Sequence, residues 1–155
     1  MAGELSKPIM HRMMQQWFRW TRSMTLGVRA LVIDGEGRIL LVRQSYTPGW
    51  LLPGGGIERG ETAHQALARE LQEEAAITLT AEPELFGFYS NETIFRGDHV
   101  AFYIVKHFLP GRFTPTAEIA DARFFDRDKL PGDTSEGTRR RIDEVFRGKT
   151  KTGLW

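Results

Sequence analysis

The stretch from Gly54 to Ile77 constrains this chain most, because it joins a glycine-rich loop to a segment with strong helical preference. The loop reads Gly-Gly-Gly-Ile-Glu-Arg-Gly-Glu and ends at Glu61, where an acid suits the positive end of a helix dipole. From Thr62 to Ala75 there is no Gly or Pro, and good helix formers predominate. The predicted helix has an apolar stripe that would pack inward, formed by Ala63, Leu67, Leu71 and Ala75.

Three glutamates are expected on one side of this helix. Glu70, Glu73 and Glu74 are three and four positions apart, so they are neighbours on a helical surface, where like charges repel. Partial burial would also raise the pKa values of these acids. A divalent cation would relieve the repulsion, and a set of oxygen ligands without Cys favours Mg²⁺ or Mn²⁺ over Zn²⁺. Arg69 is placed to pair with Glu73 or to reach back to Glu61.

A simpler interpretation is that these acids form a solvated helix face, which is the usual reason for acids at such spacings. The three helical glutamates alone do not decide between the two interpretations. The glycine loop, Glu61 and Arg69 at their spacings favour a cation site.

These positions resemble the Nudix box, in which a Gly, five residues, a Glu and seven residues precede Arg-Glu-aliphatic-x-Glu-Glu-x-Gly-aliphatic. Ala76 stands where the box has its last Gly, a position that closes the helix and favours a positive φ. The other box positions match, and they are Gly55, Glu61, Arg69, Glu70, Leu71, Glu73, Glu74 and Ile77.

The resemblance implies an α/β fold of the Nudix type, an α/β/α sandwich around a mixed β-sheet. It also implies a hydrolase that cleaves nucleoside diphosphates linked to another moiety, with Mg²⁺ or Mn²⁺ as cofactor. By position, Glu70 and Glu74 correspond to direct metal ligands, and Glu73 to a further ligand or to the carboxylate that activates water. Arg69 would orient these groups together with Glu61. The implied metal ligands, including one backbone carbonyl and one acid outside the box, are Gly54, Glu70, Glu73, Glu74 and Glu118.

The acid outside the box and the substrate contacts are less constrained. Glu118 precedes an aromatic segment, which resembles the place where many family members present an acidic loop residue; Glu92, Asp98 and Asp121 compete with it. Arg43 is a candidate phosphate contact. Aromatic side chains could stack on a base, although each is more often part of a core. They are Tyr46 and Trp50, with Phe88 and Phe95 as further candidates.

The remaining chain reads as one domain, residues 25–155, preceded by an amphipathic helical extension over residues 1–24. The extension could lie on a membrane surface, but docking on the domain or on a second subunit is favoured, so a homodimer is possible. Strands are predicted over 25–34, 38–43, 84–90 and 99–109, and a last helix from Thr134 or Ser135 to Phe146.

Composition bears on the expected cellular location and on the expected partners. The chain has no Cys and no apolar run long enough to span a membrane, which makes a cytoplasmic location the expectation. A formal charge of +1 gives no reason to expect a nucleic acid as partner, so a small nucleotide derivative is expected.

Three functions follow, in order of preference. The first is a Mg²⁺-dependent pyrophosphatase of ADP-ribose or nucleotide-sugar compounds, which releases a nucleoside monophosphate. The second is a (d)NTP or RNA 5′-end pyrophosphohydrolase, which releases pyrophosphate. The third is a non-catalytic nucleotide sensor, which would be expected to have lost box acids.

Overall fold

A mixed three-stranded sheet forms the centre of the protein. The computed structural model describes residues 13, 14, 16, 17 and 23–155. In this sheet β5 (Asp98–Val105) lies between β1 (Thr25–Val32), to which it is parallel, and β4 (Glu84–Ser90), to which it is antiparallel. Parallel pairing of β1 with β5 requires a long crossover, and that crossover contains the glycine loop and the first described long helix.

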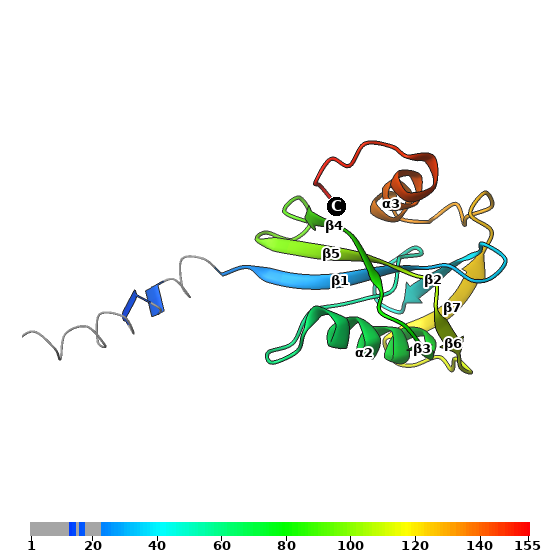
Figure 1. Ribbon diagram of the computed structural model, residues 1–155, viewed down its shortest axis with the longest axis horizontal. Coiled ribbons are helices and arrows are strands. Elements are labelled where there is room, and N and C mark those ends of the chain that lie inside the picture. Colours follow the sequence, from blue (N-terminus) through cyan, green and yellow to red (C-terminus); the bar gives the residue numbers. More distant parts are fainter. Residues whose placement is uncertain (1–12, 15, 18–22) are drawn as a thin grey trace, which may run out of the picture.

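Two antiparallel pairs extend the architecture. β2 (Ile39–Gln44) pairs with β7 (Ile119–Phe125), and β3 (Ile77–Leu79) pairs with β6 (Phe108–Pro110). The helices α2 (Ala63–Ala75) and α3 (Glu136–Arg147) lie on opposite sides of β1 and β5 (Figure 1). The predicted α/β/α arrangement around a mixed sheet is confirmed.

The sheet separates two apolar clusters. Along β1, Val28 and Ala30 belong to the cluster beneath α2, whereas Leu31 belongs to the cluster beneath α3. This alternation is the two-residue period of a strand buried on both faces. It explains why the sequence of β1 is an almost continuous apolar run.

Helix α2 has well-defined ends. Thr62 is its N-cap and forms a capping box with Gln65, in which each side chain accepts a hydrogen bond from the backbone N–H of the other residue. Ala76 closes the helix in the left-handed region with φ 54°, and it is the only described non-glycine residue with positive φ. The predicted stripe is buried at Leu67, Leu71 and Ala75, with Ala66 and Glu74 also buried and Ala63 only partly.

Some boundaries differ from the sequence-based expectation. The strand predicted over residues 99–109 is interrupted after Val105, because β6 leaves β5 and pairs with β3, a short strand that the sequence analysis missed. Most of the extension predicted over residues 1–24 lies outside the described residues. Met13, Met14, Gln16 and Trp17 are helical and exposed. Within the described part of the chain, no helix is long and apolar enough to cross a membrane.

Candidate active site

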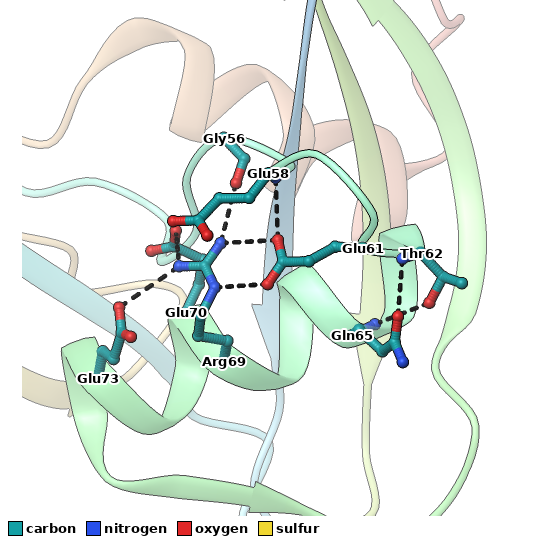
Figure 2. Close-up of polar contacts among 8 residues, drawn as sticks. All are labelled: Gly56, Glu58, Glu61, Thr62, Gln65, Arg69, Glu70 and Glu73. Atoms are coloured by element: carbon teal, nitrogen blue, oxygen red, sulfur yellow. Dashed lines mark hydrogen bonds and ion pairs between the residues drawn. The ribbon is translucent and has the colours of Figure 1, made fainter.

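Arg69 connects the glycine loop to the acidic side of α2. Its guanidinium makes two hydrogen bonds to the carboxylate of Glu61, of 2.7 and 3.0 Å, and donates to the carbonyl of Gly56 at 3.1 Å (Figure 2). It also contacts Glu70 at 2.7 Å and, more loosely, Glu73 at 3.4 Å. The predicted reach of Arg69 to both Glu61 and Glu73 is therefore present. A planar fork with five donors can hold several acceptors at once, which a lysine could not do in this geometry.

The electrostatics of this group follow from the Arg69 contacts. Hydrogen bonds from Arg69, and then from the backbone N–H of Glu58, lower the pKa of Glu61 to about 2. Hydrogen bonds to Glu61 and Glu70 raise the pKa of Arg69 further above its already high value. Glu61 and Arg69 are thus charged at neutral pH, and the loop is tied to the helix by charge-assisted hydrogen bonds.

Glu74 lies in a different environment on the same helix. It is only 7% exposed, and its carboxylate accepts one hydrogen bond, from the backbone N–H of Gly54 at 2.8 Å. Burial raises the pKa of Glu74 to about 7, opposed by the Gly54 N–H and the charge of Arg29. The charges of Glu70 and Glu118 raise this pKa further. The site therefore holds a buried acid whose ionised form would be favoured by a nearby positive charge.

The glycines of the loop allow two close approaches. Gly54 has φ 139°, and a Cβ there would lie 2.0 Å from the carbonyl oxygen of Val28. A Cβ on Gly55 would lie 2.5 Å from Oε1 of Glu70. Any side chain at either position would push the loop away from β1 or the Glu70 carboxylate away from the loop.

The Gly54 carbonyl is the backbone group that the family pattern assigns to a metal. Pro53, Gly55 and Gly56 have carbonyls that accept hydrogen bonds, from Ala30, Val28 and Arg69 in turn. Within the described residues the Gly54 carbonyl accepts none. The Gly54 N–H donates to Glu74, which fixes this residue beside the buried acid. Its unpaired carbonyl is therefore a suitable oxygen ligand for a hard cation.

The donor set fits Mg²⁺ that also binds waters and substrate phosphates. Glu70, Glu74 and the Gly54 carbonyl supply oxygens alone, which suits Mg²⁺ or Mn²⁺. Across residues 13–155 as far as they are described, no three acidic or histidine side chains converge closely enough to hold a metal by themselves. Mg²⁺ usually retains several waters and is bound by one or two carboxylates together with substrate phosphates, so the oxygens present are compatible with it.

Glu118, the predicted acid outside the box, immediately precedes β7 and is exposed. Its charge contributes to the raised pKa of Glu74. The competing acids have local partners instead. Glu92 accepts from the N–H of Gly97, Asp98 from Thr25 and Asn91, and Asp121 pairs with Arg123.

Two of the three predicted substrate contacts, Trp50 and Arg43, have partners within the protein. Trp50 is 6% exposed in the α3-side core, with Phe125 against its ring, so no face is open for a base. Arg43 follows Val42 on β2 and therefore faces the α3 side, where it pairs with Asp133 at 2.6 Å. Tyr46 is 70% exposed on the loop after β2. The burial of Trp50 corrects its assignment as a base platform.

Arg29 is the site residue that the sequence analysis missed. Its guanidinium donates to the carbonyl of Leu52 at 2.9 Å and its charge lowers the pKa of Glu74. The signal was available, since an arginine inside an otherwise apolar strand needs a polar partner.

Comparison with known proteins agrees with this geometry. A family model described as NUDIX domain matches residues 24–145. An ADP-ribose pyrophosphatase of Methanocaldococcus jannaschii is 30% identical over 104 residues, which cover 64% of this chain and 61% of that protein. An RNA pyrophosphohydrolase of Teredinibacter turnerae is 45% identical over 51 residues, 32% of this chain and 30% of that protein. The solved structure of a MutT NUDIX hydrolase from Burkholderia pseudomallei matches with a TM-score of 0.68 at 25% identity, over 79% of this chain and 98% of that one.

The chain thus spans about three-fifths of the archaeal relative and less than a third of the bacterial one. The family model, in contrast, covers most of this chain. With the box residues gathered around α2 and the glycine loop, the chain belongs to the Nudix family.

Proposed function

We propose that this protein hydrolyses the pyrophosphate bond of a nucleoside diphosphate linked to another moiety, of the ADP-ribose or nucleotide-sugar kind, and releases a nucleoside monophosphate. The observation that carries the proposal is Glu74, a buried carboxylate with one backbone hydrogen bond, beside the unpaired Gly54 carbonyl and near Glu70. The archaeal relative described as an ADP-ribose pyrophosphatase supports this choice of substrate class.

The cation would be held by Glu70, Glu74 and the Gly54 carbonyl. When bound, it neutralises diphosphate charge and lowers the pKa of a coordinated water. Arg69 keeps Glu70 in place through its own anchor on Glu61. Positioning of this kind is a large part of what a protein contributes to phosphoryl chemistry.

Two further acids could accept the proton of the attacking water. Glu73 is 60% exposed at its side chain and has the longest of the Arg69 contacts, so it can reorient toward a water or the cation. Glu118 lies on a loop close enough for its charge to reach Glu74. Either carboxylate can take the proton of the attacking water, and we leave both as candidates for the general base.

A second function is favoured by one observation. The bacterial relative with 45% identity is described as an RNA pyrophosphohydrolase, and an enzyme of that class would release pyrophosphate. A non-catalytic sensor is the third candidate, and the chain retains every acid of the box.

The test is a product analysis over a panel of ADP-ribose, nucleotide sugars, (d)NTPs and 5′-triphosphorylated RNA, with and without Mg²⁺. We expect a nucleoside monophosphate from the first two classes, and loss of turnover in Glu74→Gln. Release of pyrophosphate from triphosphates alone would favour the second function. No turnover of any compound would leave the sensor as the function.

A further inference from the structure

A cavity of about 490 Å³ lies between α3 and the segment that joins β7 to it, and we call it the α3 cavity. Its volume is within the range of about 300 to 1,000 Å³ that is typical of small-molecule sites. All of its lining residues come from positions 127–147, so it is separate from the glycine loop, β1 and α2. Its charged lining residues are Arg127, Asp128, Arg139, Asp143 and Arg147.

Helix α3 contributes one charged face to this cavity. Arg139, Asp143 and Arg147 are spaced four positions apart, so their side chains lie along one side of the helix. Ile142 also lines the cavity, is 6% exposed and belongs to the apolar cluster beneath α3. The α3 cavity therefore has a small apolar part next to its charged side chains.

Arg127 brings a further guanidinium to the cavity from outside the helix. Its Cζ lies 4.9 Å from the ring centroid of Phe146, so the planar group packs against α3. It pairs with the carboxylate of Asp128 at 4.0 Å, which is too long for a hydrogen bond. Among the described residues the guanidinium of Arg127 therefore has no hydrogen-bond acceptor, and its five N–H groups are available to a ligand.

The acids of the cavity leave its arginines only partly paired. Asp143 accepts a hydrogen bond from Lys149, which does not line the cavity, and this contact lowers the pKa of Asp143. Arg147 is loosely paired with Asp143, at 3.4 Å. Arg139 donates through Nε and Nη2 to carbonyls of residues 131–134, and its Nη1 has no acceptor in the described part of the chain. An anion in the cavity would use these free donors and reduce the repulsion between the arginines.

A neighbouring cavity of about 320 Å³ has the opposite balance of charge. It shares Arg127 and Asp128 with the α3 cavity and adds Glu36, Asp126 and Lys129. Acids outnumber bases in the neighbouring cavity, whereas arginines outnumber acids in the α3 cavity. Of the two, the α3 cavity is the one that favours an anion.

We propose that the α3 cavity binds a phosphate group through Arg127 together with Arg139 and Arg147. A phosphate ester carries close to two negative charges and three strong acceptor oxygens, so it can accept from several guanidiniums, whereas a carboxylate has one charge and two oxygens. The group is either free inorganic phosphate or the phosphate of a small ester, since both have the same chemistry. This site is independent of diphosphate hydrolysis, because it shares no residue with the candidate active site.

The first experiment measures binding of inorganic phosphate to the full chain by calorimetry, in EDTA, so that no divalent metal can bridge phosphate to the acids of α2. Arg127→Gln and Arg147→Gln are compared with Arg140→Gln, which removes an arginine of α3 that does not line the cavity. We expect phosphate to bind about tenfold more weakly in the first two variants, because each loses a hydrogen bond between charged groups, and equally well in Arg140→Gln. Equal phosphate affinity in all three variants, or no binding to the unaltered protein, would overturn the proposal.

The second experiment needs no substitution, so it does not depend on how well a variant folds. Phenylglyoxal modifies arginine side chains, and mass spectrometry of peptides gives the extent of modification at each position. Inorganic phosphate should protect Arg127 and Arg147 and leave Arg140 as reactive as before. Protection of all three to the same extent, or of none, would contradict a phosphate site in the α3 cavity.

A third comparison identifies the source of the phosphate group. Phenyl phosphate carries this group on a small apolar body, for which Leu130 and Ile142 offer apolar surface. Tighter binding of phenyl phosphate than of inorganic phosphate would assign the site to a phosphate ester, and the reverse order would assign it to the free ion. In either case the affinity should fall in Arg127→Gln, and an unchanged affinity of both ligands in that variant would overturn the proposal.

Discussion

Helices α2 and α3 each bury a glutamate, and the two glutamates differ in what surrounds them. Glu74 on α2 is 7% exposed and Glu144 on α3 is 6% exposed. Glu144 accepts from the Tyr89 hydroxyl at 2.7 Å and from Arg141 at 2.8 Å. Glu74 has one backbone N–H and a more distant arginine. The two acids are buried to a similar extent, but only Glu144 is hydrogen-bonded to an oppositely charged side chain.

The surroundings of Glu144 complete the contrast. Arg141 is fully buried and stacks over the Tyr89 ring at 3.9 Å, and burial lowers its pKa while raising that of Tyr89. A buried charge pair of this kind contributes to structure, since removal of one partner leaves the other uncompensated. Among the described residues Glu74 forms no ion pair, so a bound cation could supply its counter-charge. Burial alone therefore does not distinguish a structural acid from one that we propose binds a cation, whereas the number of partners within the protein does.

The largest effect is expected when the two glutamates are neutralised in turn. Glu74→Gln should lower turnover of a diphosphate substrate by about a hundredfold or more, as expected for loss of a group that stabilises transition-state charge, without loss of thermal stability. Glu144→Gln should leave turnover close to normal and lower the free energy of unfolding by about 3 kcal/mol, because Arg141 loses its counter-charge. Steady-state kinetics and urea denaturation of both variants measure these outcomes. Equal changes in turnover and in the free energy of unfolding for the two variants would contradict the proposed difference between Glu74 and Glu144.

A second prediction concerns pH. In metal-free protein Glu74 binds its proton more tightly when folded, with a pKa of about 7, than when unfolded, with the ordinary value of 4.5. The free energy of unfolding should therefore fall as pH rises from about 4.5 to about 7, by roughly 3 kcal/mol from this group. Urea denaturation in EDTA at pH 5 and pH 8 measures the change. Glu74→Gln should lack this component, and added Mg²⁺ should restore stability at pH 8; an identical pH dependence in Glu74→Gln would contradict the assignment.

The smallest effect is expected at the helix ends, where the comparison can be made without charge. Helix α2 ends at Ala76 with φ 54°, and α3 at Gly148 with φ 63°. Ala76→Gly should raise the free energy of unfolding by about 0.5 to 1 kcal/mol, and Gly148→Ala should lower it by a similar amount, because the left-handed region favours glycine. Thermal denaturation of the pair measures both. A destabilising Ala76→Gly would show that the alanine methyl contributes packing that outweighs the backbone strain.

Much of the fold could be predicted from local sequence. The helix within Thr62 to Ala75, the strand from Glu84 to Ser90 and a cap of α3 at Thr134 or Ser135 follow from residue preferences that act over a few positions. The pairing of β3 with β6 could not be predicted in this way. A three-residue strand has too little pattern of its own, and its existence depends on a partner about thirty residues away.

The candidate site likewise contains residues that local sequence could place and residues that it could not. Arg69, Glu70 and Glu74 are fixed by spacing on one helix, so the sequence places them together. Arg29 and Trp50 depend on which face of a strand or loop meets the rest of the protein. Sequence spacing does not contain that information, and it led to Arg29 being missed and Trp50 being assigned to the substrate.

The three consecutive glycines of the loop have unequal tolerance to change. At Gly54 and Gly55 an added carbon atom would overlap the Val28 carbonyl or the Glu70 carboxylate, whereas at Gly56 it would meet nothing within 4 Å. Substitutions at the first two glycines should therefore be removed by selection, both among natural relatives and in a random mutant library. Substitutions at the third glycine should be tolerated. The variability of the three positions among relatives should therefore reflect how little space β1 and α2 leave for a side chain at each.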